Sequence, residues 1–292
     1  FDGKPPVGVK VFIEGEEEMG SPSMDAILDA YPEETRADVY VIADSMNWAV
    51  GKPALTTSLR GLVDAVVTVS TLETGVARLL ATLHDDEGNV AIEGLVRDPD
   101  PAIDYDEDTL RAESGVLDGV QWFGDGHRAA QMWTRPAASV LAIDATPVKD
   151  ASNTLIASAR AKVSVRIAPT EDPANAEAAL RDHLLKHAPW GAKVEVKPER
   201  GGSGSRVSLD DDRARAAVSA LKEAFGVDPV EMGVGGSIPI VAEFMTRNPG
   251  CLVLLTAVVD PTSRMHGIDE SLDLGDFGKA AVAEALLLEK LA

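Results

Sequence analysis

The sequence is poor in cysteine, in aromatic residues and in long apolar runs. Of its 292 residues only Cys251 is a cysteine, and aromatic residues make up 4%. A single cysteine forms no intrachain disulfide, which suits a reducing compartment, so we expect a cytoplasmic protein. Cys251 lies in the apolar run GCLVLLTAVV, where we expect a small core residue rather than a reactive thiol. No apolar run reaches 18 residues, which excludes a membrane-spanning helix.

Basic residues are also scarce. The chain has 27 basic and 48 acidic residues, for a formal net charge of −21. This balance argues against binding to nucleic acid or to an anionic membrane surface, because both need basic patches. The acids supply many candidate metal ligands without identifying any of them.

Two β-branched runs near the start of the chain are each followed by acids. VGVKVFIEG (7–15) and ADVYVIADS (37–45) are predicted as buried strands, and SMDAILDAY between them has helical spacing. Parallel strands would bring the acids that follow them, Glu16 to Glu18 and Asp44, to the same edge of the sheet. That carboxyl edge is where ligands bind in open α/β sheets.

The middle of the chain has a different pattern. ARAKVSVRIAP (159–169) alternates as a half-buried strand, and DPANAEAALRDHLLKHAP after it is predicted as an amphipathic helix. Strand-like and helical segments alternate with hairpin-like joints, which indicates a smaller α+β domain over 57–200. RGGSGSRVS (200–208) is predicted as a flexible joint, after which a helix–strand–helix pattern returns. The simplest architecture is a larger α/β domain, formed by 1–56 and 201–292, into which the smaller domain is inserted.

Glu17 and Glu18 are candidates for paired chemistry. Adjacent side chains at a strand end point in different directions, so one carboxylate can bind a cation while the other takes a proton from water. Asp44 would add an oxygen ligand and His266 a nitrogen, a set that suits Zn, Mn or Co. The alternative is a solvated acidic turn.

Other polar residues have two readings each. GVGGSIP (233–239) offers backbone N–H groups and the Ser237 hydroxyl ahead of a helix, either as an anion site or as a tight turn with an N-cap. Arg166 lies in a half-buried strand and needs a partner, which is either a substrate carboxylate or a structural ion pair. His183 and His187 are one helical turn apart without an accompanying Glu, so we expect a solvated helix face rather than a metal site.

Six segments in order resemble the M20 family of metallopeptidases, the aminoacylase- and carnosinase-like hydrolases. They are EGEEEMGSP, VIADSMNW, LTTSLRGL, SNTLIASARAKVSVRIAPTEDP, GVGGSIPIVAEF and DPTSRMHGIDES. The resemblance implies an α/β fold, with a zinc-exopeptidase-like catalytic domain that is incomplete here and an inserted α+β lid domain. It also implies hydrolysis of dipeptides or N-acyl amino acids with two divalent metal ions, Zn first, with Mn or Co as alternatives. A homodimer formed through the lid is expected.

The resemblance also implies a role for each matching residue. Glu17 matches the general base that activates the metal-bridging water, and Glu18, Asp44 and His266 match metal ligands. Substrate-binding groups are matched in the loop and in the lid, by Gly236, Ser237, Arg166 and Asn153.

The sequence departs from the family pattern in three places. An upstream His-x-Asp ligand and a bridging Asp have no counterpart here, and the sequence opens FDGKPPVGVK without Met or a signal peptide. VTVSTLE runs directly into TGVARLL, where the family has a loop carrying a His-Ser-Gly motif, and Asp269 stands where the family often has Asn. We therefore expect that part of the catalytic domain lies outside this sequence; the alternative is a degraded homologue.

Two functions follow from these observations. The first is a metal-dependent dipeptidase or related amide hydrolase with Glu17 as its base. The second is a non-catalytic dimerising or binding module derived from a truncated hydrolase, which would explain the missing ligands directly.

Overall fold

The computed structural model describes residues 3–70 and 74–292. They divide into two compact units. The first comprises Phe1–Ser58, Arg206–Val234 and Ile238–Ala292, and the second comprises Leu59–Ser205 and Gly235–Ser237. The predicted cut between VTVSTLE and TGVARLL falls on 71–73, outside the described residues. In the described ranges, no helix is long and apolar enough to cross a membrane.

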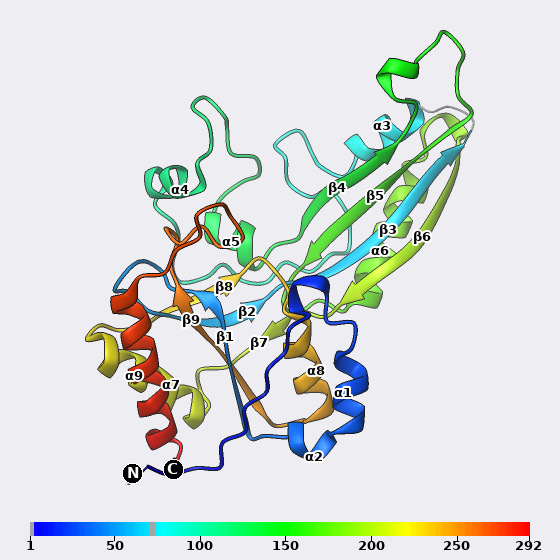
Figure 1. Cartoon of the computed structure of the whole chain (residues 1–292). Coiled ribbons are helices and arrows are strands. Elements are labelled where there is room, and N and C mark those ends of the chain that lie inside the picture. The colour runs from blue at the N-terminus through cyan, green and yellow to red at the C-terminus, as the bar shows by residue number, and fades with distance from the viewer. Residues whose placement is uncertain (1–2, 71–73) are drawn as a thin grey trace. The chain divides into compact units, whose positions relative to one another are not determined.

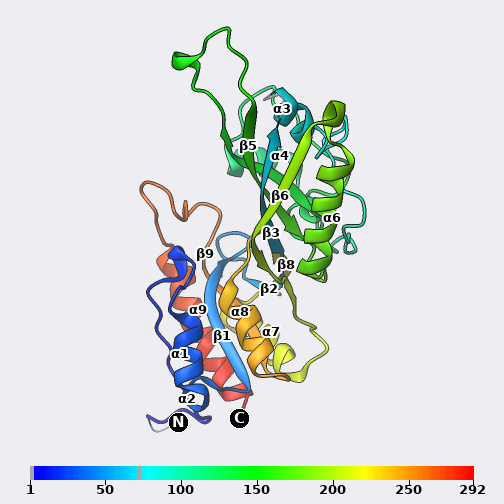
Figure 2. The ribbon, with the colours of Figure 1, turned by 90° about the vertical axis from the view of Figure 1, so that its right-hand side faces the viewer.

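The first unit is a mixed sheet with helices on both faces (Figures 1 and 2). Its strands follow the order β1, β9, β2 and β7, with β8 also paired to β2. β1 and β9 are parallel, whereas β2 is antiparallel to β9. The strand bounds are β1 Val39–Met46, β2 Ala54–Leu59, β7 Ser205–Arg206, β8 Val230–Val234 and β9 Leu252–Val259.

Helices of the first unit bury small and aliphatic side chains against this sheet. α7 (Asp212–Phe225) packs beside α9 (Leu274–Lys290) on one face, while α1 (Met24–Ala30) and α8 (Pro239–Arg247) lie on the other (Figure 2). The core between α7, α9 and the sheet contains Leu55, Ala214, Ala217, Leu254 and Leu287. Alanines let the helices approach closely, which suits a chain with few aromatic residues. The remaining short elements are η1 (Glu17–Met19) and α2 (Pro32–Thr35).

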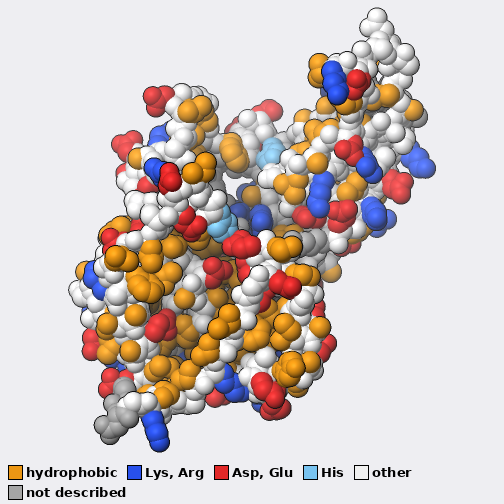
Figure 3. All heavy atoms as spheres, viewed as in Figure 1, with side chains coloured by type: hydrophobic (Ala, Val, Ile, Leu, Met, Phe, Trp, Pro, Cys, Tyr) orange, Lys and Arg blue, Asp and Glu red, His pale blue; other side chains and the backbone are white. Residues whose placement is uncertain are grey.

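Residues 7–15 do not form the predicted strand. They follow an irregular path, and Val11 and Ile13 are 81% and 88% exposed. Figure 3 shows hydrophobic side chains spread over the face of the first unit that is turned to the viewer in Figure 1. β-Branched composition favours a strand only where a partner strand completes the hydrogen-bonding ladder. Here the Lys10 ammonium donates instead to the carbonyls of Glu33 and Arg36, at 2.6 and 2.7 Å.

The second unit is a four-stranded antiparallel sheet in the order β4, β5, β3 and β6. Its strands are β3 Gly61–Ser70, β4 Ala137–Asp144, β5 Ser158–Ile167 and β6 Lys193–Gly202. Its helices are α3 Thr74–Ala81, α4 Glu107–Ser114, α5 Arg128–Trp133 and α6 Pro173–Lys186, with short turns η2 Val148–Asp150 and η3 Pro189–Gly191. One face is apolar and the other carries charges, the usual division of an antiparallel sheet that packs helices on one side.

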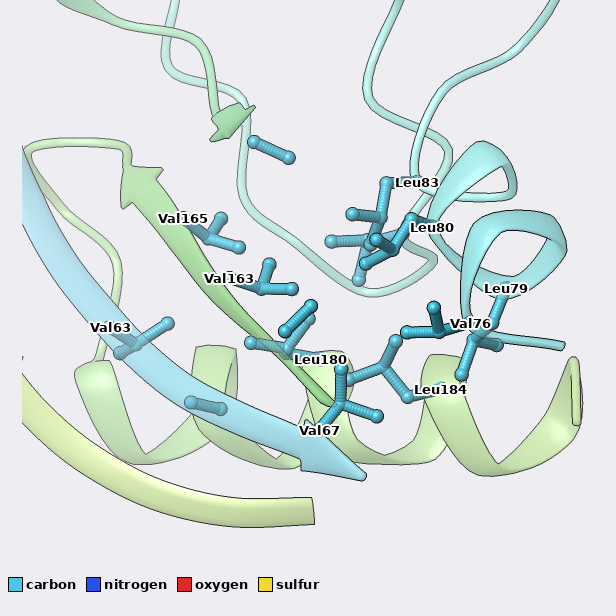
Figure 4. Close-up of a cluster of buried hydrophobic side chains, with 14 of the residues drawn as sticks. Val63, Val67, Val76, Leu79, Leu80, Leu83, Val163, Val165, Leu180 and Leu184 are labelled. Carbon is cyan, nitrogen blue, oxygen red and sulfur yellow. The ribbon is translucent and has the colours of Figure 1, made fainter. Parts of the chain in front are cut away.

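The alternating pattern predicted for 159–169 is confirmed in β5. Its odd-numbered residues from Ala159 to Ile167 are buried. They pack with β3 against Leu180 and Leu184 of α6 and against Leu79 of α3 (Figure 4). The predicted helix that follows is also confirmed, and it starts where Asp172 accepts a hydrogen bond from the Ala174 N–H with Pro173 in the first turn.

One local prediction in the second unit is wrong, and another is right only in part. His183 is 5% exposed rather than solvated, because α6 packs that face inward, and its Nε2 lies 3.0 Å from the Thr82 hydroxyl. The joint predicted at 200–208 contains the boundary between the two units, at Ser205 and Arg206, but it is partly regular, since β6 extends to Gly202 and β7 begins at Ser205. A Cβ on Gly204 would lie 2.7 Å from the Leu59 carbonyl oxygen, so this glycine serves close packing rather than flexibility.

Candidate active site

The acidic turn that follows residues 7–15 is a single turn of 3₁₀ helix. Gly20 N–H donates to the Glu17 carbonyl at 2.8 Å, and Gly20 has a left-handed backbone with φ 85°. The Glu16 carboxylate accepts a hydrogen bond from Ser23 N–H at 3.1 Å, so it stabilises the entry to α1 and is not simply solvated. This arrangement leaves Glu17 and Glu18 as the acids available for chemistry.

His266 lies in a loop with unusual backbone conformations. Arg264, His266 and Asp269 all have positive φ values of 53°, 64° and 60°. Such conformations are costly for residues other than glycine and concentrate at functional sites. The loop is closed by a hydrogen bond from Ser271 N–H to the Ser263 carbonyl at 2.9 Å. The fold therefore holds His266 in a strained position.

Glu18 and His266 meet although 248 positions separate them. His266 Nε2 lies 3.1 Å from Glu18 Oε1, and both side chains are well exposed. Asp44 comes from β1, at a bulge where the pairing with β9 shifts between Ile42 and Ser45. A bulge bends the strand and re-aims its side chains. Glu18 and His266 are therefore in direct contact, and Asp44 is near enough to Glu17 to act on its charge.

The electrostatic environment of Glu17 shows this proximity. Burial raises the pKa of Glu17 above its usual value, and the nearby charges of Asp44, Glu18 and Glu14 raise it further. His266 acts in the opposite direction and lowers the pKa of Glu17. A carboxyl group with a raised pKa is better suited to exchange protons near neutral pH than an ordinary glutamate. Glu14 has a buried Oε1 with no hydrogen-bond partner in the part of the chain that the structure describes.

The fit of a metal ion to these residues is partial. Carboxylate and imidazole donors suit Zn, Mn or Co, and Glu18 with His266 provides one of each. Within the described ranges, no group of three or more potential ligands gathers closely enough to hold a metal ion. The donor chemistry therefore fits a divalent metal, but the number of donors falls short of a complete site.

A second polar cluster joins a strand and a loop of the second unit. Arg166 Nη1 donates to the Ser237 hydroxyl at 3.3 Å. Gly236 precedes Ser237 in the same half-buried loop. A guanidinium, a hydroxyl and a glycine-rich backbone form a group that suits a carboxylate.

Arg60 belongs to this cluster, and the sequence reasoning missed it. Its Nε donates to the Gly235 carbonyl at 2.9 Å, and its Nη1 donates more weakly to the Gln131 and Arg135 carbonyls at 3.3 and 3.4 Å. Burial, together with the charge of Arg166, lowers the pKa of Arg60 to about 10. A side chain at Gly235 is disfavoured, because a Cβ would lie 2.9 Å from the Met132 carbonyl oxygen and 2.8 Å from Arg60 Nη2. The available signal was an arginine flanked by Leu59 and Gly61 in an otherwise apolar stretch.

Asn153 does not join Arg166. Asn153 is exposed in the connection between β4 and β5, before β5 begins at Ser158. Arg166 lies near the other end of β5. The intervening strand is roughly 26 Å long at about 3.3 Å per residue. The two side chains therefore do not reach one small ligand within a single copy of this unit.

Comparisons with known proteins identify the family to which the chain is similar. The pattern of the family described as "Peptidase family M20/M25/M40" matches residues 1–290. Cysteinylglycine-S-conjugate dipeptidase from Corynebacterium striatum is 34% identical over 315 residues, covering 98% of this chain and 68% of the relative.

Two solved structures have the same fold. Dug1p, a di-peptidase from Saccharomyces cerevisiae, superposes with a TM-score of 0.77 at 22% identity, covering 95% of this chain. Human carnosine dipeptidase 1 also gives a TM-score of 0.77 at 22% identity, covering 96% of this chain. The chain spans 64% and 65% of the lengths of these two proteins, which is less than two thirds of either. The mixed α/β architecture predicted from the sequence is thereby confirmed.

Proposed function

Since this chain belongs to peptidase family M20/M25/M40, we propose that it carries part of the active site of a metal-dependent dipeptidase. The observation that carries the proposal is the position of Glu17, next to the Glu18–His266 contact and the charge of Asp44. The similar proteins are named as dipeptidases, which supports short peptides as the substrate class.

In this proposal each of these residues has a role. Glu18 and His266, with Asp44, would hold divalent metal ions, Zn first among them. When bound, such ions polarise the scissile carbonyl and lower the pKa of water. Glu17 Oε accepts a proton from the attacking water and delivers it to the leaving amine. Its raised pKa makes the Glu17 carboxylate a stronger base, which favours the first transfer.

The second cluster binds the substrate's free carboxylate. Arg166 and Ser237 supply a charged and a neutral donor, and the backbone at Gly236 supplies a further N–H group. Arg60 holds the loop through Gly235 and adds a second positive charge nearby. Asn153 is proposed to bind the substrate carbonyl, and its distance from Arg166 within one copy favours a contribution from a second copy.

We propose that the second unit forms a homodimer interface. β4 is an edge strand of its sheet, and Val140, Leu141 and Ile143 on it are 40%, 58% and 54% exposed. An exposed apolar edge strand is a template for pairing with another chain. Light scattering should give a dimer for the native protein and a monomer for Leu141→Lys combined with Ile143→Lys. A dimer that persists in this variant would assign the interface elsewhere.

The catalytic proposal is tested by Glu17→Gln. This change keeps the side-chain volume but removes the base, so hydrolysis of Cys-Gly and β-Ala-His should fall by about 10²–10⁴-fold. Metal content, measured by elemental analysis after dialysis, should stay that of the unaltered protein. Glu34→Gln makes the same change at an exposed acid on α2, so it is a matched control and should leave turnover unchanged. Turnover retained in Glu17→Gln would refute Glu17 as the base.

The absence of a three-ligand cluster within the described ranges favours one alternative, a non-catalytic binding module. That alternative predicts less than stoichiometric Zn or Mn in the purified protein and no dipeptide hydrolysis after metal is added. Stoichiometric metal together with turnover would exclude it.

A further inference from the structure

A cavity of about 250 Å³ lies within the second unit. Of the residues in the two clusters described above, it shares only Arg60. It is bordered by the start of β4, by α5 and by the segments around 84–97 and 122–124. Four arginines line it, Arg60, Arg97, Arg128 and Arg135. Four guanidinium groups around one cavity are unexpected in a chain with a net charge of −21.

Three of these arginines lack an acidic partner among the residues the structure describes, and of these three Arg60 is occupied by backbone carbonyls. Arg135 pairs with Asp100 at 2.9 Å. By contrast, Arg97 donates only to the Val90 carbonyl at 3.2 Å. Arg128 donates through one nitrogen, Nη1, to the Gln131 side chain at 2.9 Å and to a backbone carbonyl. A guanidinium has five N–H donors, so both side chains keep donors and a full charge for a bound anion.

The rest of the wall is apolar and aromatic. Trp122, Phe123, Leu110 and Met132 line the cavity. The Trp122 indole is held by a hydrogen bond from its Nε1 to Glu107 at 3.1 Å, and the Arg128 guanidinium lies 5.9 Å from the ring centroid. Phe123 is 73% exposed, which is unusual for so large an apolar side chain and leaves a ring free to cover a ligand.

We propose that this cavity binds a small organic anion with an aromatic body. Its carboxylate would face Arg97 and Arg128, and its ring would lie against Trp122 and Phe123. Apolar cavities of about 150 Å³ admit benzene in other proteins, so this volume accommodates a ring together with a carboxylate. The site is independent of metal binding and of peptide hydrolysis, and it stands whether or not the proposed function holds.

The test measures binding by isothermal titration calorimetry. Phenylacetate is the probe, and phenylacetamide is its neutral analogue. Phenylacetate should bind saturably with one site per chain, and phenylacetamide at least 10-fold more weakly. The double variant Arg97→Gln, Arg128→Gln should weaken phenylacetate binding at least 10-fold. Arg160→Gln, an exposed arginine on β5 outside the cavity, is the matched control and should bind like the unaltered protein.

Two further variants keep the result interpretable. Phe123→Ala changes an exposed side chain and should fold normally, yet it should weaken binding at least 3-fold. Arg166→Gln should leave binding unchanged, which separates this cavity from the cluster at Ser237. No saturable binding, equal binding of the amide, loss of binding in Arg166→Gln, or unchanged binding in both the double variant and Phe123→Ala would each overturn the proposal.

Discussion

Replacement of Arg60 by Met should weaken substrate binding with little effect on the chemical step. Arg60 donates one strong hydrogen bond, to the Gly235 carbonyl at 2.9 Å, and two weaker ones. Hydrogen bonds that involve a charged group contribute about 1.5–3 kcal/mol each. Loss of the strong bond should release the Gly235–Ser237 loop from its position and so weaken substrate binding. A loss of this size corresponds to a rise in KM of about 10- to 150-fold. Because Arg60 touches no reacting atom in this scheme, kcat should change by less than about 3-fold.

The measurement is steady-state hydrolysis of a dipeptide and of its C-terminal amide by native protein, Arg60→Met and Arg60→Lys. Arg60→Lys keeps the charge and should recover part of the affinity for the dipeptide. Arg160→Met removes an exposed arginine from the same unit and serves as the charge-matched control. A fall in kcat with KM unchanged would refute the reasoning, as would a KM equal to that of Arg160→Met. Either result would mean that the loop keeps its position without Arg60.

Three stability predictions follow from buried groups of the described structure. Burial lowers the pKa of His183, so the unfolded chain binds a proton below about pH 6.5 that the folded chain excludes, and the free energy of unfolding should fall on acidification. Urea denaturation at pH 7.5 and 5.5 should show that the free energy of unfolding falls less on acidification in His183→Gln than in native protein. Leu184→Ala should cost about 2–5 kcal/mol, because Leu184 is 0% exposed, whereas Leu185→Ala, at 41% exposed, should cost under about 1 kcal/mol; equal losses would contradict the packing of α6. Burial raises the pKa of Glu284 above 4.5, so its ionised form lowers stability increasingly as pH rises past that value. Glu284→Gln should therefore be more stable than native protein at pH 7, with the difference vanishing near pH 4; a destabilised variant at pH 7 would contradict this.

The proposed base and metal ligands show which features the sequence predicts and which it does not. Glu17, Glu18, Asp44 and His266 were selected by residue type and by resemblance, and the structure places Glu18 against His266 and Asp44 near Glu17. The expected strand before Glu17 is absent, so the acids do not stand at a strand end. The turn that presents them is held by local backbone hydrogen bonds instead. Their assignment as base and ligands remains a prediction.

Local patterns determined most of the regular elements. Alternation of apolar residues predicted β5, and helical spacing after an Asp-Pro start predicted α6, because both signals depend on near neighbours in the chain. In the same way, the apolar run after Cys251 predicted β9. The composition also indicated a core built from aliphatic side chains, as both hydrophobic clusters show.

Tertiary structure decided the features that depend on distant partners. Residues 7–15 have strand-like composition without a partner strand, and His183 looks solvated until α6 is packed against the sheet. Arg60 is unremarkable in the sequence, yet its environment comes from Gly235 and Arg166, more than 100 positions away. The energy of a strand ladder, a buried imidazole or a buried guanidinium depends on what lies opposite. A sequence pattern reports a residue's neighbours along the chain, and only the fold determines its neighbours in space.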